Sequence, residues 1–402
     1  MRILVVDKLA PFVAGRLQDL GGVVTVDPSA KDAALTAKVA DLDPEVVIVR
    51  STRVTGADIG AGKALSLVIR AGAGVNTIDL GAASARGVYV ANCPGKNAIA
   101  VAELAVGLLL ACDRRIPDNV NRLREGKWDK KNLGSARGLN GRKIAVLGTG
   151  QIGREFIARA LALGMVVTAW SRSLTSEAAA ALGVARAETP EAAVAGAHAV
   201  SVHLALAKET RGRIGESVFA AMKSGAIFVN TARAEVVDHD ALLRAIDEKK
   251  LKVGLDVFPD EPSAGQADYT HPVANHPSVY GTHHIGASTD EAEEAVGEEV
   301  VRIVAAYKAG APIPNCVNLA TRTPATHQLV VRHADRVGVL AGVLGVLRES
   351  GVNVEDMQNI IFSGGEAACA RIAVKGAIGA DALARIQSLP NIFAASVVAL
   401  KE

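Results

Sequence analysis

Three stretches of the chain carry side chains suited to acid–base chemistry on a small anionic molecule. Arg233 lies in "NTARAEVVD", Glu261 in "LDVFPDEP" and His284 in "GTHHIGAST", and each stretch follows an apolar run typical of a buried strand. The carboxyl ends of parallel strands meet at one edge of a sheet, so we expect the three side chains to gather there. An imidazole can exchange protons near neutral pH, and a guanidinium fork suits a carboxylate.

The adjacent histidines His283 and His284 raise the question of which one does chemistry. His271 and His276 are nearby, but the irregular loop spacing of the four histidines does not match a zinc site, so no metal is expected. A purely structural role for His284 stays open at this point.

The segment "VLGTGQIG" predicts a dinucleotide-binding loop. Gly148, Gly150 and Gly153 come directly after an apolar strand and directly before a helical stretch. The first glycine permits a tight turn, the second lets a pyrophosphate approach the backbone, and the third allows close packing of helix and strand. A glycine turn without a ligand is the alternative.

The next strand, "MVVTAWSRS", lacks the acid that usually binds the adenosine ribose. Ser171 stands at that position and Arg172 follows it. Without a carboxylate, a charge-assisted hydrogen bond to the ribose is lost, and so is the repulsion of a 2′-phosphate. NAD is the expected cofactor, and NADP is not excluded.

The elements that position these residues form two doubly wound parallel-sheet units of an α/β fold. Short apolar strands alternate with helical stretches from residue 1 to about 91, and a second such series starts at Lys143. Two units of this kind in tandem leave a cleft suited to cofactor and substrate. A long helix is predicted from about Ala98 to Arg115 between them.

The C-terminal part is expected to form a separate small domain. One amphipathic helix follows residue 289, and Pro312 and Pro314 end it. From about residue 325 to 402 the pattern reads strand, helix, strand, strand, helix, strand, which predicts a βαββαβ domain.

The overall composition argues against nucleic-acid or membrane-surface binding. Of the 402 residues, 50% are hydrophobic and 3% aromatic, and the formal net charge is +2. The run "AIAVAELAVGLLLACDRR" contains Glu103 and is too short to cross a bilayer comfortably, so a buried helix is expected. Four scattered cysteines without a CxxC motif favour free thiols and a cytoplasmic location.

Together the glycine loop and the three polar stretches resemble the D-2-hydroxyacid dehydrogenase family, and "RAGAGVNTIDL", "AELAVGLLL" and "GKW" extend the resemblance over essentially the whole chain. The resemblance implies a substrate domain of residues 1–97 and 287–315 and a Rossmann domain of residues 98–286. It also implies a C-terminal ACT domain at 325–402.

The resemblance assigns the chemistry to His284, since "HIGAST" begins there and His283 replaces a proline usual in the family. His284 would take the hydroxyl proton of a 2-hydroxy acid, Glu261 would hold His284 and favour its protonated form, and Arg233 would bind the substrate carboxylate. The cofactor would contact the glycine loop and the strand ends, at Gly148, Gly150, Gln151, Ile152, Gly153, Ser171, Arg172, Leu204, Thr231, Ala232, Asp256, Gly286 and Ala287.

The first unit would bind the other end of the substrate. Backbone amides of Ala73, Gly74 and Val75 would form an anion nest, and Asn97 is a further polar contact. Arg50, Arg53 and Arg70 lie at or just after apolar strands and suit a phosphorylated substrate. Each of the three arginines could instead be a surface charge.

The implied activity is NAD(P)-dependent oxidation of D-3-phosphoglycerate to 3-phosphohydroxypyruvate in a homo-oligomer, either a dimer or a tetramer. L-serine is the expected effector of the ACT domain, at His333, Asp335 and Asn353, although the domain could serve only in oligomerisation. The alternatives are a glyoxylate/hydroxypyruvate reductase or another D-2-hydroxyacid dehydrogenase and, more distantly, a non-catalytic dinucleotide-sensing corepressor.

Overall fold

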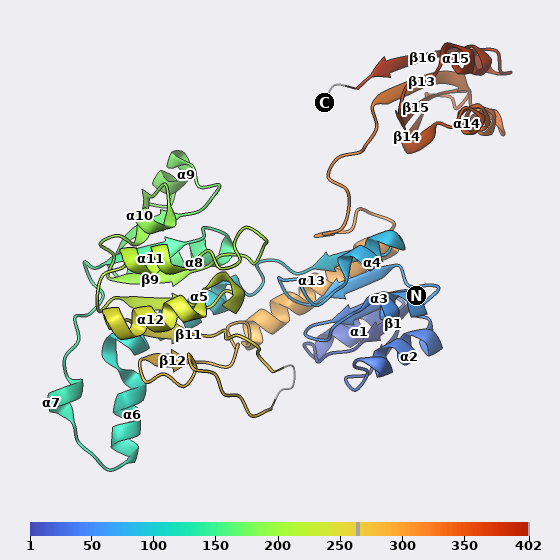
Figure 1. The fold of residues 1–402 in the computed structure, drawn as a ribbon. Coiled ribbons are helices and arrows are strands. Elements are labelled where there is room, and N and C mark those ends of the chain that lie inside the picture. Colours follow the sequence, from blue (N-terminus) through green and yellow to red (C-terminus); the bar gives the residue numbers. More distant parts are fainter. Residues whose placement is uncertain (263–265, 401–402) are drawn as a thin grey trace. The chain divides into compact units, whose positions relative to one another are not determined.

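The computed structural model describes residues 1–262 and 266–400 (Figure 1). The chain divides into two compact units, Met1–Asn318 and Leu319–Glu402. The larger unit contains two parallel sheets, and the smaller one contains a single antiparallel sheet. The predicted fold class is therefore confirmed.

The first sheet of the larger unit has the strand order β2-β1-β3-β4-β5, and all neighbouring strands are parallel. The strands are β1 (Arg2–Val5), β2 (Val23–Val26), β3 (Val46–Val49), β4 (Leu67–Arg70) and β5 (Tyr89–Asn92). The four residues of β3, "VVIV", are all buried, because helices cover both faces of the sheet.

Five helices cover this sheet, and one of them comes from much later in the chain. Side chains of α1 (Phe12–Asp19) and α13 (Asp290–Lys308) pack on one face. The other face is covered by α2 (Ala33–Leu42), α3 (Gly56–Ala61) and α4 (Leu80–Ala85). The predicted long amphipathic helix after residue 289 thus completes the core of the N-terminal sheet.

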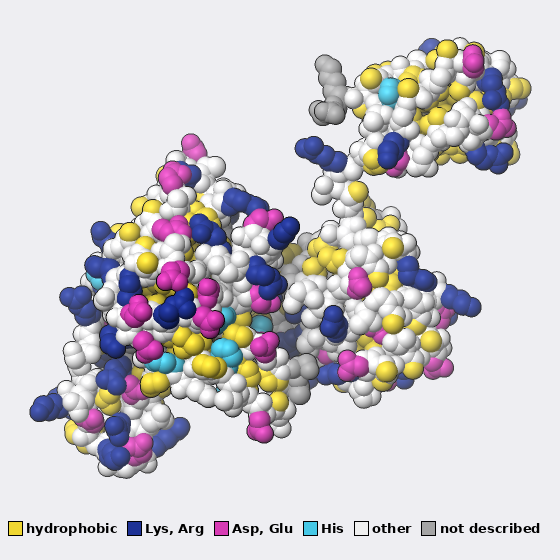
Figure 2. Space-filling model, viewed as in Figure 1, with side chains coloured by type: hydrophobic (Ala, Val, Ile, Leu, Met, Phe, Trp, Pro, Cys, Tyr) yellow, Lys and Arg dark blue, Asp and Glu magenta, His cyan; other side chains and the backbone are white. Residues whose placement is uncertain are grey.

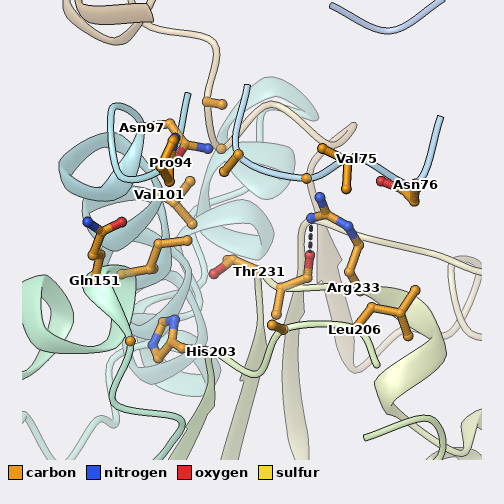
Figure 3. Close-up of a pocket in the computed structure, with 18 of the residues that line it drawn as sticks. Val75, Asn76, Pro94, Asn97, Val101, Gln151, His203, Leu206, Thr231 and Arg233 are labelled. Atoms are coloured by element: carbon orange, nitrogen blue, oxygen red, sulfur yellow. Dashed lines mark hydrogen bonds between the residues drawn. The ribbon is translucent and has the colours of Figure 1, made fainter. Parts of the chain in front are cut away.

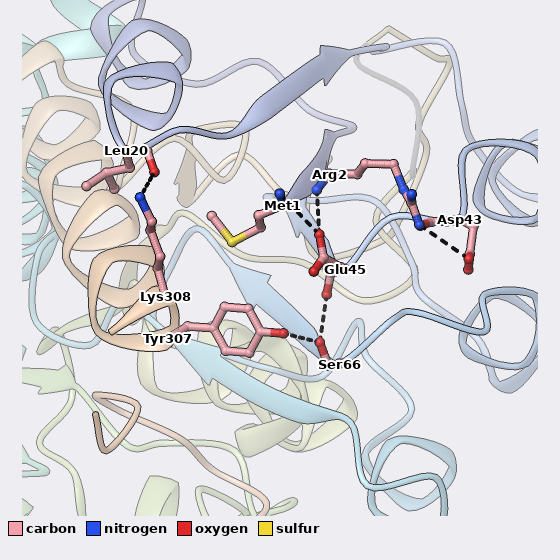
Figure 4. Close-up of polar contacts among 8 residues, drawn as sticks. All are labelled: Met1, Arg2, Leu20, Asp43, Glu45, Ser66, Tyr307 and Lys308. Carbon is pink, nitrogen blue, oxygen red and sulfur yellow. Dashed lines mark hydrogen bonds and ion pairs between the residues drawn. The ribbon is translucent and has the colours of Figure 1, made fainter. Parts of the chain in front are cut away.

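Polar contacts fix the last turn of α13 to the first sheet (Figure 4). The Tyr307 hydroxyl contacts the Ser66 hydroxyl next to β4, and Lys308 Nζ donates to the carbonyl of Leu20 at 2.6 Å. Ser66 also donates to the carbonyl of Glu45, whose carboxylate accepts from the backbone N–H of Arg2 at 2.7 Å. The helix end is therefore tied to β1, β3 and β4 together.

The second sheet has the order β12-β11-β10-β9-β6-β7-β8, with all neighbours parallel. Its strands are β6 (Lys143–Leu147), β7 (Val166–Trp170), β8 (Ala185–Arg186), β9 (Ala199–Val202), β10 (Ile227–Asn230), β11 (Lys252–Leu255) and β12 (Val279–Gly281). This is the order of a dinucleotide-binding fold extended by one edge strand.

Helices cover both faces of the second sheet as well. The apolar face of α5 (Ala98–Arg114) joins α8 (Gln151–Ala162) and α9 (Ser176–Ala181) on one side. On the other side lie α10 (Pro190–Val194), α11 (Glu216–Ala221) and α12 (His239–Lys249). Two short helices, α6 (Ile116–Arg124) and α7 (Lys130–Leu133), contain no buried residue and stand apart from these layers (Figure 1).

Each parallel sheet has one point at which the strand order reverses. In the first sheet it lies between β1 and β3, and in the second between β6 and β9. Ligands of open α/β sheets bind beyond the carboxyl ends of the strands at such points. The predicted domain limits at residues 97/98 and 286/287 fall at the start of α5 and shortly before α13, and the assignment of these parts as domains stays a prediction.

The smaller unit is a four-stranded antiparallel sheet with two helices. Its order is β14-β15-β13-β16, built from β13 (His327–Ala334), α14 (Val339–Glu349), β14 (Asn353–Ile361), β15 (Ala367–Lys375), α15 (Ala380–Gln387) and β16 (Ile392–Ala399). The helices and one sheet face enclose a core that includes Leu329, Val343 and Ile372.

The surface carries mixed charge on the face drawn in Figure 2, where basic and acidic side chains are interspersed. This agrees with the nearly neutral net charge of the chain. Among the described residues, none of the helices is long and apolar enough to cross a membrane.

Candidate active site

A cavity of about 830 Å³ in the larger unit collects the predicted site (Figure 3). Loops that follow β4 and β5 of the first sheet line one side of it. Loops at the carboxyl ends of β6, β9, β10 and β11 of the second sheet, and the loop before α13, line the rest. The cavity therefore lies at the strand ends where the polar site residues were predicted.

The glycine loop has the backbone geometry that a pyrophosphate site requires. Gly148 adopts φ +106°, and a Cβ there would lie 2.5 Å from the carbonyl oxygen of His203. A Cβ on Gly153 would lie 2.0 Å from the carbonyl oxygen of Gly148. Gly150 precedes α8 and caps it without a side-chain hydrogen bond, so the first N–H groups of the helix are available to an anion.

Buried polar atoms on the cavity wall provide a second test of the fit to a dinucleotide. Thr231 Oγ1, His203 Nδ1 and Asn97 Oδ1 have no hydrogen-bond partner among the residues that the structure describes. Buried polar atoms are normally paired, so these three are suited to a polar ligand in the cavity. The glycine loop and these atoms together fit the predicted cofactor.

His203, at the end of β9, is a neutral residue under the glycine loop. Its ring lies 4.9 Å from the ring of Phe156 in α8, and Nε2 pairs with the Ser201 hydroxyl at 2.9 Å. Burial lowers the pKa of His203 to about 3. The imidazole therefore serves as a polar but uncharged group in this wall.

His284 and Glu261 form the central pair of the site. His284 Nδ1 lies 2.6 Å from Glu261 Oε2, and Glu261 Oε1 accepts from the backbone N–H of Phe258 at 2.7 Å. Burial acts to raise the pKa of Glu261, but the hydrogen bonds from His284 and Phe258 and the charge of Arg233 outweigh it and lower that pKa. Glu261 therefore stays ionised and orients the imidazole.

The loop that carries His284 is fixed by Asp256, the first residue after β11. One carboxylate oxygen accepts from Thr282 Oγ1 at 2.7 Å and from the backbone N–H of Ile285 at 2.9 Å, and the other accepts from Gly286 at 2.9 Å. These bonds flank His284, which adopts φ +53°. A left-handed backbone at a histidine is uncommon and needs such support.

Arg233 follows β10, and a local turn fixes its backbone. The side-chain amide of Asn230 donates to the Arg233 carbonyl at 3.0 Å and accepts from the backbone N–H of Ala232 at 3.0 Å. The guanidinium donates to the Ala232 carbonyl at 2.7 Å and points toward Val75 and Asn76 across the cavity (Figure 3). Arg233 therefore faces the predicted anion nest.

That nest, residues 73–75, lines the cavity and is tied to the neighbouring strand. Asn92 donates from Nδ2 to the Ala73 carbonyl at 2.6 Å, and the N–H of Cys93 donates to Gly72. Arg70 lies beside it, and burial together with the charges of Arg233 and Arg50 lowers the pKa of Arg70 to about 10. Several cationic groups therefore share this end of the cavity.

Most of the predicted cofactor and substrate residues line the cavity. They are Arg70, Ala73, Gly74, Val75, Asn97, Gly150, Gln151, Ile152, Leu204, Thr231, Ala232, Arg233, Asp256, His284, Gly286 and Ala287. Glu261 reaches the site through His284, and Gly148 and Gly153 shape the loop beneath it.

Besides Glu261, Gly148 and Gly153, four residues expected in the site do not line this cavity. Arg50 lines a smaller neighbouring pocket. Arg53 is exposed and lines neither pocket, because Asp7 fixes the backbone of residues 50–52 and the chain has left the strand end by residue 53. Ser171 and Arg172 follow β7 but are not part of the cavity wall.

The three predicted effector residues differ in exposure. His333 is 1% exposed, and its ring nitrogens contact the Ala334 carbonyl and Asn359 Oδ1. Asp335 and Asn353 are exposed, and Asn353 donates to Glu355 at 2.8 Å. A soluble effector can therefore reach Asp335 and Asn353, but not the ring of His333.

Three residues that matter to the geometry were not predicted. Asp7, two residues after β1, accepts from the backbone N–H groups of residues 50–52. His203 and Glu293 are the others, and both line pockets. Asp7 and His203 each follow an apolar strand, so a search of all strand ends would have found them.

Within the described ranges 1–262 and 266–400, no three or more His, Cys, Asp or Glu side chains converge as a metal site would require. His271 instead lies edge-on to His239 and stacked on Tyr269.

The fold and the cavity together define a two-lobed, dinucleotide-binding α/β protein. Residues 106–286 match the family model described as the NAD-binding domain of D-isomer specific 2-hydroxyacid dehydrogenases. The chain is 37% identical over 327 residues to a D-3-phosphoglycerate dehydrogenase of Rattus norvegicus, covering 81% of this chain and 60% of that protein.

Solved structures agree with this match. The TT0316 protein of Thermus thermophilus is 31% identical with a TM-score of 0.70, covering 79% of this chain and all of that one. NAD⁺-bound 3-phosphoglycerate dehydrogenase of Entamoeba histolytica is 26% identical with a TM-score of 0.66, covering 79% of this chain and 99% of that one.

The chain belongs to the D-isomer specific 2-hydroxyacid dehydrogenase family, and its second lobe is an NAD-binding domain of that family. It spans 60 to 64% of the length of the curated relatives it matches, which are named D-3-phosphoglycerate dehydrogenases.

Proposed function

We propose that the protein is an NAD-dependent dehydrogenase that interconverts D-3-phosphoglycerate and 3-phosphohydroxypyruvate. The observation that carries this proposal is the arrangement of the His284–Glu261 pair, Arg233 and the half-buried Arg70 around one cavity beside the glycine loop. The curated relatives named D-3-phosphoglycerate dehydrogenases support the choice of substrate.

His284 is the proposed acid–base residue. Its Nδ1 faces Glu261, so Nε2 is the nitrogen that can take the substrate hydroxyl proton during oxidation and return it during reduction. Ionised Glu261 keeps the ring in this orientation and stabilises the imidazolium that forms. Asp256 acts as a positioning residue, since it holds the loop on either side of His284.

Arg233 and the first lobe are the proposed substrate anchors. The guanidinium of Arg233 binds the carboxylate and polarises the carbonyl oxygen of the keto acid, with the backbone amides of residues 73–75 on the other side. Arg70 and Arg50 are the cations proposed for the phosphate at the far end of the substrate.

The cofactor is proposed to lie along the glycine loop and the strand ends that line the cavity. The start of α8 at Gly150–Ile152 would hold the pyrophosphate, and Thr231, Ala232, Gly286 and Ala287 would flank the nicotinamide end. When bound, the nicotinamide ring accepts or returns the hydride of the substrate C2.

The initial rate of absorbance change at the nicotinamide band, with 3-phosphohydroxypyruvate and either NADH or NADPH, tests this function. We expect turnover with a preference for NADH, and a rate lower by about 10² to 10⁴ in the His284→Ala protein. Turnover of glyoxylate or hydroxypyruvate but not of the phosphorylated acid would overturn the substrate assignment. NADH binding without turnover of any 2-keto acid would overturn the enzymatic function.

A reductase of unphosphorylated hydroxypyruvate or glyoxylate is the second candidate, because one of the proposed phosphate ligands already has an anionic partner. Arg50 forms an ion pair with Glu293. The two candidates share the same acid–base chemistry and differ only in the far end of the substrate.

We further propose that the smaller unit is an ACT-type effector domain that binds L-serine at Asp335 and Asn353. Exposure of both residues, and their positions just after β13 and at the start of β14, support this. Saturating L-serine is expected to slow the enzyme and raise its melting temperature, and Asp335→Ala should remove both effects. No change in rate or melting temperature would remove the proposal.

We also propose that the protein is a cytoplasmic homo-oligomer. The apolar residues Ile116, Val120 and Leu123 of α6 are spaced along one helical face and are 47%, 37% and 59% exposed. An exposed apolar stripe of this kind suits contact with a second copy of the chain. The free cysteines, of which Cys93 and Cys112 are buried, support a reducing compartment.

A further inference from the structure

Arg50 forms an ion pair with Glu293, a residue more than two hundred positions later in the chain. Arg50 Nη1 lies 2.6 Å from Glu293 Oε1, and the two side chains are 30% and 32% exposed. Arg50 is the first residue after β3, and Glu293 is in the first turn of α13. The packing of α13 on the first sheet brings the two together.

The ion pair lines a side pocket of about 70 Å³ next to the main cavity. Arg70, Asn97 and Ala287 line both the side pocket and the main cavity. The side pocket therefore adjoins the end of the cavity at which Arg70 lies. Under the proposed function, the far end of the substrate would reach this place.

Glu293 is the only acidic residue among the described residues that line the side pocket, and Arg50 and Arg70 are the only basic ones. Nε of Arg70 is buried without a partner in the described part of the chain. The two arginines are therefore not equivalent. Arg70 is free to take an anionic ligand, whereas Arg50 is already neutralised by a carboxylate of the protein.

We propose that Glu293 is a specificity-determining residue that disfavours substrates with an anionic far end. A phosphate that binds Arg50 must either displace the Glu293 carboxylate from Nη1 or bind the other guanidinium N–H groups with that carboxylate close by, and both are unfavourable for an anion. A neutral hydroxymethyl end does not have to displace Glu293. This inference rests on the proposed function. In that function, Glu293 determines how strongly the site prefers a phosphorylated acid over an unphosphorylated one.

Steady-state kinetics of Glu293→Gln test the inference. We compare kcat/KM for 3-phosphohydroxypyruvate with kcat/KM for hydroxypyruvate in the wild type, in Glu293→Gln and in Glu294→Gln. Glu294 is the matched control, because it is an exposed neighbour that lines neither pocket. The ratio should rise about threefold to fivefold in Glu293→Gln, the scale of a partly exposed ion pair, mainly through a lower KM for the phosphorylated acid.

An equal ratio in Glu293→Gln and Glu294→Gln, or a fall of the ratio in Glu293→Gln, would overturn the inference. If Glu293→Gln does not fold, Glu293→Asp replaces it. The shorter side chain cannot keep the same contact with Arg50, so the ratio should move in the same direction by a smaller amount.

Thermal denaturation with inorganic phosphate separates this inference from the proposed function. Phosphate should raise the melting temperature of Glu293→Gln more than that of the wild type or of Glu294→Gln. Equal shifts in the three proteins would count against the role of Glu293. If the wild type does not turn over the phosphorylated acid, the proposed function fails. The phosphate titration alone then decides whether Glu293 weakens the binding of an anion at Arg50.

Discussion

His284 and its neighbour His283 are both exposed, but they differ in their contacts. His284 lines the cavity and pairs with Glu261, whereas His283 does not line the cavity. A histidine pair in one loop therefore offers a matched test of which ring exchanges protons.

We expect His284→Ala to lower kcat by about 10² to 10⁴, because the acid–base group is lost. His283→Ala should change kcat only a few-fold. Stopped-flow single-turnover rates, together with NADH binding by fluorescence, measure both effects. Equal losses in the two variants would contradict the assignment, and lost NADH binding in His284→Ala would indicate a damaged fold.

His203 makes the stability of the protein depend on pH. Its pKa in the folded protein is lowered to about 3, whereas an unfolded chain binds the proton near pH 6.5. Between these values the unfolded state holds more protons, so the free energy of unfolding falls as the pH decreases. The stability that the neutral His203 ring allows is fully present above about pH 6.5, and it is lost progressively as the pH falls from 6.5 toward about 3.

Urea unfolding near pH 7 and near pH 5 checks this. His203 alone should account for a loss of about 2 kcal/mol between the two conditions, and His203→Gln should lack that loss. His283→Gln is the matched control, because it makes the same replacement at an exposed histidine. A His203→Gln protein with the pH dependence of the wild type would contradict the burial of a neutral ring.

At the scale of elements, the strands of both parallel sheets were predictable where they are buried. The runs around β1, β3, β4 and β5 and those of β6, β9, β10 and β11 are continuous and apolar, which is the pattern of parallel strands covered on both faces. The short edge strands β2 and β8 were missed; Val23 and Val26 of β2 are 68% and 52% exposed, and both residues of β8 are exposed. The helix α6 was missed as well, since it contains no buried residue.

The site was predictable where its residues follow strands in one sheet. Arg233, Asp256 and the loop of His284 come after β10, β11 and β12, which pair in register, so their strand ends had to meet. The pair of Arg50 and Glu293 was not predictable in this way. It depends on the packing of α13 against the first sheet, and no local pattern reports a contact between such distant segments.

The residue that follows β7, Ser171, is expected to affect the preference for NADH over NADPH. Gly148 donates its N–H to the carbonyl of Trp170, so the residue after Trp170, Ser171, follows directly beside the glycine loop. Ser171→Asp should raise the preference for NADH over NADPH by about tenfold or more, since a carboxylate bonds a ribose diol and repels a 2′-phosphate. Ser173→Asp, at an exposed position two residues on, controls for the added charge.

Dissociation constants from fluorescence titration of the two nicotinamide cofactors measure the preference. An unchanged ratio in Ser171→Asp would mean that the ribose lies elsewhere.

At the scale of the whole molecule, α6 is a helix without a buried residue whose apolar side chains have no cover in the described part of the chain. Its apolar residues face solvent, and the nearby Trp128 is 83% exposed. We expect Leu123→Asp to reduce the oligomer to smaller species, whereas Asn121→Asp, an exposed polar position of the same helix, should leave it intact. Light scattering after size exclusion gives the mass of each. A wild-type monomer, or an unchanged mass in Leu123→Asp, would contradict a contact through α6.

The packing of α13 against the first sheet also has a consequence for the folding of the protein during its synthesis on the ribosome. Val300, Ile303 and Val304 complete a core whose other members, such as Ile3, Ile48 and Ile69, are synthesised long before them. One face of the first sheet therefore stays partly uncovered until α13 has been synthesised. The NAD-binding lobe is continuous in the chain and can close its own core earlier. The lobe that begins the polypeptide is then the one that finishes folding later, and during translation its exposed apolar face is a natural place for a chaperone to act.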